Sequence, residues 1–286
     1  MPTHATPRLV KTVSELRAAV AAARSEGSKI GLVPTMGALH EGHLSLVRAS
    51  RRECGFTVVT IYVNPSQFGP SEDYRRYPRT LEDDIRRLAG AADLVFAPAD
   101  EEVYPSGYST WVDVGAVAAP LEGQYRPGHF CGVATIVLKL FQMAGADEAY
   151  FGQKDYQQVL VIRRMVEDLN VPIAIRVCPT VREPDGLAMS SRNACLSAEA
   201  RRRALVLWKS LRLAQDMVAG GERRTAVILS EMERTIHCGP VNRIDYVVLV
   251  DPQTLLPIDV IDGPALAAVA VVVEQTRLID NCLLEP

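Results

Sequence analysis

The sequence of 286 residues lacks a cysteine pair at C-x-x-C spacing, and its six cysteines form no other close group. Such spacing is typical of zinc sites and disulfide frameworks, so we expect reduced, mostly packed thiols. A long hydrophobic run is also missing, because the most apolar stretch, 265–273, is too short to span a bilayer as a helix. Residues 1–8 contain no apolar signal core, which makes a cytoplasmic location the expectation.

The chain has no strong excess of charge of either sign. Lys and Arg number 31 and Asp and Glu 34, which gives a net charge of −3. A broad basic field is therefore absent, and we expect neither nucleic acid nor a membrane as a partner. With 48% hydrophobic and 23% charged residues, the composition is that of a globular protein, and small-molecule substrates are the favoured partners.

Short apolar segments alternate with helical patterns over the first 180 residues. Continuous apolar runs between helices are typical of buried parallel strands, so the alternation predicts an α/β fold with a Rossmann-like, doubly wound parallel sheet. The expected strands are 30–33, 56–63, 94–96, 148–151 and 173–177, and the expected helices are 13–27, 42–52, 81–88, 133–143 and 156–169.

After a polar loop at 182–193 the pattern changes. It predicts a smaller C-terminal α+β domain. The expected helices are 197–219 and 223–237, and the expected strands are 243–250, 267–273 and 276–283. We therefore predict a nucleotide- and substrate-binding domain at residues 1–180 and a lid domain at residues 181–286.

The turn after the first long strand reads PTMGALHEGH over residues 34–43. Gly37 and Gly42 would let a ligand approach the backbone closely, and His40 and His43 share one face of a helix start. A helix N-terminus carries about half a positive charge and free N–H groups, so two imidazoles there predict a phosphate-binding site. The zinc-binding motif H-E-x-x-H places its histidines at positions i and i+4, whereas these lie at i and i+3, so the turn does not match that motif. The alternative is that both histidines only cap and pack.

Other polar residues follow later strand ends, where parallel sheets bind ligands. Asn64 and Gln67 carry amides that both donate and accept, which suits a hydroxy acid. Lys154 is placed to meet a phosphate, with Gln158 one helical turn onward. For each of these residues the alternative is a solvated or turn-forming side chain.

Two further segments could bind a nucleotide. The polar run 189–193, MSSRN, could clamp a triphosphate, although a plain polar linker has the same residue types. Asp83 and Asp84 could bind Mg²⁺, which takes one or two carboxylates together with phosphates. Carboxylates at a helix start also serve as simple caps.

Six motifs occur in a fixed order over residues 34–193: PTMGALHEGH, VNPSQF, YPRT, RPGHFCGV, FGQKDYQQ and MSSRN. Together they closely resemble the pantoate–beta-alanine ligase family, and residues 276–281 are also similar to it. Residues 40–43 also resemble the HxGH signature of the wider nucleotidylyltransferase superfamily. One departure is Gln153, which stands where many family members have Glu.

The resemblance implies ATP-dependent condensation of (R)-pantoate with beta-alanine through an enzyme-bound pantoyl adenylate, giving pantothenate, AMP and pyrophosphate for coenzyme A biosynthesis. It implies Mg²⁺ and a homodimer. It assigns catalysis to His43, His40, Lys154 and Arg192, pantoate binding to Asn64, Gln67 and Gln158, and beta-alanine binding to Gln67. The implied ATP-binding residues are Met36, Gly37, Ala38, Leu39, His40, Glu41, Gly42, His43, Gly152, Gln153, Lys154, Asp155, Val181, Met189, Ser190, Ser191 and Arg192.

Other functions share parts of this pattern. A nucleotidylyltransferase that stops at AMP transfer would have the same fold and HxGH turn. An aminoacyl-tRNA synthetase is disfavoured, because the chain is short and lacks an evident basic tRNA-binding domain. A non-catalytic nucleotide-binding module could dispense with one of the four catalytic candidates, all of which are present. The motif residues Arg126 and His129 could support the crevice or contact phosphate.

Overall fold

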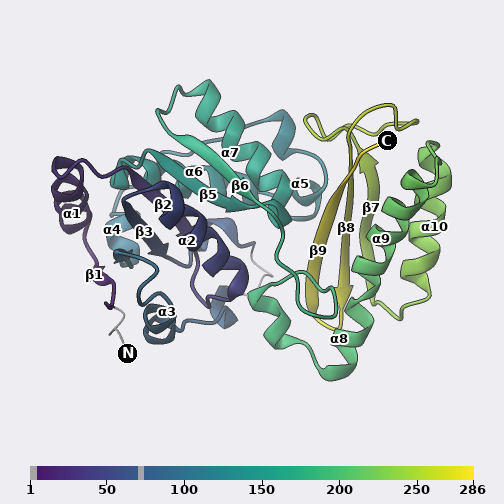
Figure 1. Ribbon diagram of the computed structural model, residues 1–286, viewed down its shortest axis with the longest axis horizontal. Helices are drawn as coiled ribbons and strands as arrows, with labels where there is room; N and C mark the ends of the chain where they lie inside the picture. The colour runs from purple at the N-terminus through teal and green to yellow at the C-terminus, as the bar shows by residue number, and fades with distance from the viewer. Residues whose placement is uncertain (1–4, 70–73) are drawn as a thin grey trace. The chain divides into compact units, whose positions relative to one another are not determined.

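The structure, a computed structural model, describes residues 5–69 and 74–286 (Figure 1). The first four residues of the N-terminal segment expected to lack a signal core lie outside these ranges. The chain forms two compact units, one of Met1–Gln153 and Gln157–Pro179 and the other of Lys154–Tyr156 and Thr180–Pro286. Each unit has its own secondary structure and core.

In the first unit, the strands among the described residues form a six-stranded parallel sheet in the order β1-β4-β3-β2-β5-β6. The strand order reverses between β2 and β5, and such a sheet binds ligands outside the carboxyl ends of its strands at that point. The strands are β1 (Arg8–Val10), β2 (Ile30–Thr35), β3 (Phe56–Ile61), β4 (Leu94–Phe96), β5 (Glu148–Gly152) and β6 (Ala174–Cys178).

Helices cover both faces of this sheet (Figure 1). The first helix starts at a capping box, in which Thr12 and Glu15 bond each other's backbone N–H groups. The helices are α1 (Val13–Ser25), α2 (Glu41–Glu53), α3 (Leu81–Arg87), α4 (Asp100–Val103), α5 (Glu122–Tyr125), α6 (His129–Ala144) and α7 (Tyr156–Asp168), with 3₁₀ turns η1 (Pro65–Gln67), η2 (Tyr74–Arg76), η3 (Ala116–Ala118) and η4 (Gln153–Asp155).

Alternate residues of the central strand enter two different cores. Ile30 and Leu32 of β2 belong to a core shared with α1, α6 and α7, whereas Val33 belongs to a core shared with α2 and the end of α3. A sheet buried on both faces requires this arrangement, since successive side chains point to opposite faces. The predicted doubly wound α/β fold is confirmed.

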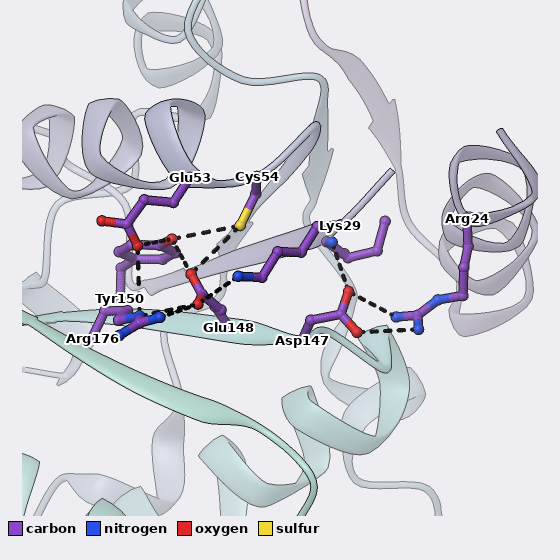
Figure 2. A network of polar contacts seen from close by, with 9 residues as sticks. Arg24, Lys29, Glu53, Cys54, Asp147, Glu148, Tyr150 and Arg176 are labelled. Atoms are coloured by element: carbon purple, nitrogen blue, oxygen red, sulfur yellow. Dashed lines mark hydrogen bonds and ion pairs between the residues drawn. The ribbon is translucent and has the colours of Figure 1, made fainter. Parts of the chain in front are cut away.

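Charged residues gather at the amino ends of β2 and β5 (Figure 2). Glu148 is 1% exposed and accepts hydrogen bonds from Arg176 Nε at 3.0 Å, Lys29 Nζ at 2.7 Å and the Tyr150 hydroxyl at 2.6 Å. Burial raises the pKa of Glu148, but the hydrogen bonds from Arg176, Lys29 and Tyr150 outweigh it and lower the pKa to about 2. The network lies at the edge opposite the ligand-binding edge, so we assign it a structural role.

The second unit contains a three-stranded antiparallel sheet in the order β7-β8-β9. Its helices α8, α9 and α10 share one core with the sheet, which confirms the predicted α+β arrangement. The single helix expected at 197–219 is wrong in one respect, because the chain breaks at Leu205. The elements are η5 (Ser191–Cys195), α8 (Ala198–Ala204), α9 (Val206–Ala219), α10 (Thr225–His237), β7 (Arg243–Val250), β8 (Ala265–Val273) and β9 (Thr276–Leu284).

Candidate active site

The turn between β2 and α2 has two residues in the left-handed region, Gly37 with φ of +82° and Ala38 with φ of +49°. Glycine adopts this conformation freely, but alanine does so at a cost, so other contacts must hold the turn. Asp84, which is 1% exposed, provides them. Its Oδ2 accepts the Ala38 N–H at 2.9 Å, and its Oδ1 accepts the Leu39 N–H at 2.7 Å. Asp84 therefore fixes the shape of the turn.

His40 and His43 lie together at the start of α2, as their spacing predicts. His40 is the N-cap and His43 the third helical residue, and their ring centroids are 4.1 Å apart. The His40 N–H donates to Nδ1 of His43 at 3.3 Å, so a neutral His43 carries its hydrogen on Nε2. A donor at Nε2 beside a helix N-terminus can bind a phosphate oxygen, and the doubly protonated ring can also give a proton to one.

The two carboxylates predicted to bind Mg²⁺ have protein partners. Asp84 holds the turn and also accepts from Thr80 Oγ1 at 3.2 Å, and exposed Asp83 forms an ion pair with Arg86. Within the two described ranges, no group of three or more His, Cys, Asp or Glu side chains could hold a metal ion. Mg²⁺ on a nucleotide needs only one or two carboxylates besides phosphates, so the metal role of Asp83 and Asp84 stays a prediction.

Asn64 and Gln67 lie just after β3, on either side of the first residues of η1. Asn64 is 1% exposed, and its Nδ2 donates to Oε1 of Gln67 at 3.2 Å. Its Oδ1 accepts from the Ser66 and Tyr104 hydroxyls, each at 2.9 Å. Nε2 of Gln67 lies 3.1 Å from Sδ of Met36. The two amides thus link the end of β3 to the turn that follows β2.

The residues after β5 place a cation next to a strand end. Lys154 lies in η4 with its side chain 19% exposed, and its Nζ is 3.6 Å from Asp155 Oδ1. Gln158, near the start of α7, is half-buried, while its neighbour Gln157 donates to backbone carbonyls of Val117 and Pro120. An ion pair as long as that of Lys154 is weak, so the ammonium group can turn toward a phosphate.

In the second unit, the predicted ATP-binding residues Val181 and Met189 are joined by the Met189 N–H, which donates to the Val181 carbonyl at 3.0 Å. Ser190 caps η5, because its hydroxyl accepts the Arg192 N–H at 3.3 Å. Residues 181 and 189–192 therefore form one local structure, which presents Ser190, Ser191 and Arg192 from a single short segment.

Arg182 braces this segment from within the same unit. Its guanidinium donates to both carboxylate oxygens of Asp280, at 2.6 and 3.1 Å, and stacks on Trp208 with its Cζ 3.9 Å from the ring centroid. Asn281, which follows Asp280 in β9, donates from Nδ2 to the Lys154 carbonyl at 2.7 Å. Strand β9 therefore supports both the 181–192 segment and the backbone of Lys154.

Comparisons with known proteins give the family. The sequence model described as pantoate-beta-alanine ligase matches residues 8–283. Pantothenate synthetase of Moorella thermoacetica is 56% identical, over 97% of this chain and 98% of its own. The crystal structure of pantothenate synthetase from Thermus thermophilus has a TM-score of 0.93 and 49% identity, covering 98% of this chain and 100% of that chain.

The chain belongs to the pantoate-beta-alanine ligase family. The predicted family, enzyme class and ligation of pantoate to beta-alanine are thereby confirmed. Pantoate-beta-alanine ligase of Francisella tularensis, solved in complex with beta-gamma ATP and beta-alanine, has a TM-score of 0.78 and 33% identity over 97% of each chain. Across the described residues of this ligase, no helix has the length and apolar character needed to cross a membrane.

Sequence reasoning missed two supports of the ligase site. The sequence indicates only a cap or a metal ligand at Asp84, and nothing in the local sequence indicates that this side chain reaches Leu39. Arg182 lies in a predicted polar loop, and only the similarity of residues 276–281 to the family draws attention to the stretch that includes its partner Asp280. Both contacts join residues far apart in sequence, which local patterns do not reveal.

Proposed function

We propose that the ligase works in two steps at the turn between β2 and α2. In the first step, a carboxylate oxygen of (R)-pantoate attacks the α-phosphorus of ATP, the bond to the pyrophosphate oxygen breaks, and pantoyl adenylate forms. In the second step, the neutral amine of beta-alanine attacks the acyl carbon and loses a proton, and AMP leaves as the acyl–oxygen bond breaks. No covalent enzyme intermediate is required.

The arrangement of His40 and His43 carries this proposal. Adenylation gathers negative charge on phosphoryl oxygens, and donors that are fixed in place beforehand stabilise that charge without reorganising. His43 is the proposed proton donor: the neutral ring, held by the His40 N–H, donates a hydrogen bond from Nε2, and the doubly protonated ring, in which Nδ1 no longer accepts from His40, transfers the proton. His40, Lys154 and Arg192 are the other proposed catalytic residues, each stabilising phosphoryl charge.

ATP binding is proposed for two kinds of donor. Backbone N–H groups at the start of α2 suit phosphates, and the segment around Ser190 offers hydroxyl and guanidinium donors. Aligned reactants can gain effective molarities of roughly 10⁵ to 10⁸ M, so binding in register supplies much of the rate. The proposed set is Met36, Gly37, Ala38, Leu39, His40, Glu41, Gly42, His43, Gly152, Gln153, Lys154, Asp155, Val181, Met189, Ser190, Ser191 and Arg192.

Pantoate binding is proposed for Asn64, Gln67 and Gln158, and beta-alanine binding for Gln67. The hydrogen bond between the Asn64 and Gln67 amides supports this, because it fixes the side chain of Gln67 beside the turn after β2. The Francisella tularensis ligase binds beta-gamma ATP together with beta-alanine, which supports binding of both ligand types here.

Mg²⁺ is proposed to arrive with ATP. The described residues offer no preformed carboxylate cage, and Asp84 already accepts from backbone donors, which fits an ion held mainly by phosphates. When bound, the ion would neutralise phosphate charge. Asp83 remains the better candidate as a protein ligand, because its carboxylate is exposed. A Mg²⁺ titration of Asp83→Asn tests this role, since loss of a ligand would raise the Mg²⁺ concentration needed for half-maximal rate.

We further propose a cytoplasmic homodimer, as the family resemblance implies. Sedimentation equilibrium tests the oligomeric state, with a monomer at micromolar concentration as the contrary outcome. Fractionation of cells that produce the ligase tests the location.

The purified ligase, incubated with ATP, Mg²⁺ and D-pantoate with and without beta-alanine, tests the reaction. We expect pantoate-dependent pyrophosphate, with AMP and pantothenate released in quantity only when beta-alanine is present. A rate of pyrophosphate release that does not depend on pantoate would contradict the proposal. Pyrophosphate formation with stable AMP transfer to another acceptor would favour the nucleotidylyltransferase alternative.

A further inference from the structure

Two basic residues of the RPGHFCGV motif, Arg126 and His129, have no part in the proposed reaction steps. His129 is the first residue of α6 and is 8% exposed. It follows Gly128, whose φ of +81° turns the chain into the helix. Both side chains reach the carbonyl of Gln67 at the end of η1.

The partners of His129 determine which ring nitrogen carries hydrogen. Nδ1 lies 2.8 Å from the carbonyl oxygen of Gln67, and Nε2 lies 3.0 Å from Nη1 of Arg126. A carbonyl oxygen only accepts, and a guanidinium only donates. His129 therefore donates from Nδ1 and accepts at Nε2, which requires the neutral Nδ1–H tautomer.

Arg126 is held in a largely buried position. Its Nη1 lies 3.8 Å from Oε2 of Glu122, and the two side chains are 14% and 8% exposed. Its Nη2 lies 3.4 Å from the Gln67 carbonyl oxygen. The guanidinium fork thus spans a carboxylate, an imidazole and a carbonyl, a pattern that a lysine ammonium could not reproduce.

The first turn of α6 also contacts η1 directly. A Cβ on Gly132 would lie 2.2 Å from the Ser66 carbonyl oxygen, so only glycine allows this approach. The Gly132 carbonyl accepts from Nδ2 of Asn64 at 3.2 Å. The same Nδ2 donates to the side chain of Gln67. Gln67 is therefore held at its backbone by His129 and at its side chain by Asn64.

We propose that His129 is a positioning residue that fixes Gln67 for pantoate and beta-alanine, and that Arg126 sets the tautomer of His129. The inference rests on the proposed function, in which Gln67 contacts both substrates. Small displacements of a substrate-binding group are costly, because reacting atoms must be aligned closely.

Two substitutions separate the two nitrogens of His129. The side-chain amide of asparagine can take the place of Nδ1, whereas glutamine carries its amide at the place of Nε2 and leaves Nδ1 without a donor. We expect His129→Asn to keep KM for pantoate and beta-alanine within about threefold, and His129→Gln to raise both about tenfold. KM for ATP is expected to stay within about twofold in both variants, and His237→Gln, at the exposed end of α10, serves as the control.

A merely structural role predicts another result. Equal losses in both variants, or a rise in KM for ATP as large as that for pantoate, would overturn the proposal. ¹⁵N NMR of the wild-type imidazoles, with the His129 signal assigned through His129→Asn, gives a second measurement that does not need a folded glutamine variant. The neutral Nδ1–H form is expected, and a protonated or Nε2–H ring would overturn the proposal.

Failure of the underlying function is distinguishable. In that case the wild-type enzyme would release pyrophosphate without regard to pantoate, while the tautomer of His129 would remain Nδ1–H. If instead the wild type shows the ligase reaction but Gln67→Ala leaves KM for pantoate and beta-alanine unchanged, the role of Gln67, and with it that of His129, is wrong.

Discussion

Leu39 donates its backbone N–H to the carboxylate of Asp84 at 2.7 Å, across 45 residues of sequence. The same carboxylate accepts the N–H of Ala38. Asparagine at position 84 would keep one of the two side-chain oxygens and present an NH₂ group to the other backbone N–H donor. Since hydrogen bonds to charged groups contribute about 1.5–3 kcal/mol, we expect Asp84→Asn to lower kcat/KM for ATP roughly tenfold to hundredfold.

The control for this substitution is Glu82→Gln, an exposed neighbour in the first turn of α3 that loses the same charge. Pantoate-dependent pyrophosphate release measures both variants. We expect the control to match the wild type. Equal losses would mean that the charge at the helix start, and not the hold on the turn, governs the rate.

Much of the fold could be predicted because its strands are continuously apolar and end at turn residues. The sequence did not reveal β1, which is only three residues long, or the first turn of α6, where His129 precedes the apolar run. The break at Leu205 was also missed, because no glycine or proline marks it. Short edge elements and such breaks depend on tertiary contacts, which outweigh local propensity.

The candidate site shows the same division. Residues 40 and 43 could be placed from the helical period alone, and the structure puts their rings 4.1 Å apart. The bonds of Asp84 to the turn, and of His129 to Gln67, join different elements of the fold. Candidate substrate-binding residues at strand ends can therefore be predicted from the sequence. The residues that hold them in place are found only when the fold is known.

The tautomer of His43 gives a prediction about proton transfer. In the neutral ring Nδ1 accepts from His40 and Nε2 donates a hydrogen bond, so the proton that the proposed mechanism transfers must come from the doubly protonated ring. His43→Gln keeps an N–H near that position but has no proton to give. We expect kcat to fall by about 10²–10⁴, the usual contribution of a general acid, with a much smaller change in KM for ATP. Retention of kcat within about tenfold would show that His43 acts only as a hydrogen-bond donor.

The network around Glu148 gives a prediction about pH (Figure 2). Its folded pKa of about 2 lies below the ordinary value of 4.5, so its contribution to stability is complete above about pH 4.5 and disappears as the pH falls toward 2. We expect Glu148→Gln to lower the free energy of unfolding by about 1–3 kcal/mol at pH 7. In urea titrations, the difference from wild type should shrink through that window. A constant difference down to pH 2 would contradict the prediction.

Glu222 provides a matched comparison for Glu148. Hydrogen bonds from Arg224 also lower its pKa to about 2, but Arg224 is a surface residue. Solvent and salt screen such a pair, so we expect Glu222→Gln to cost less stability than Glu148→Gln and to lose its effect at high ionic strength. If the loss of stability caused by Glu148→Gln also disappeared at high ionic strength, solvent and salt would screen the Glu148 network as they screen the Glu222 pair.

Arg182 and Arg212 both lie near Trp208, with guanidinium carbons 3.9 and 5.7 Å from the ring centroid. Arg182 also bonds both oxygens of buried Asp280, while Arg212 pairs with exposed Asp216. Lysine keeps the charge but loses the two-pronged hydrogen bonding and the stacking. We expect Arg182→Lys to lower the free energy of unfolding of the C-terminal unit by about 1–3 kcal/mol, and Arg212→Lys to change it by less than about 0.5 kcal/mol.

Arg182→Lys should also affect nucleotide binding. Arg182 braces the segment that holds Val181 and Met189, and the strand of its partner Asp280 also supports the backbone of Lys154 through Asn281. Because the segment and the lysine are proposed to bind ATP, we expect KM for ATP to rise severalfold while KM for pantoate changes less. Steady-state kinetics with each substrate varied in turn would measure both. A larger rise in KM for pantoate than for ATP would show that Arg182 supports a different part of the site.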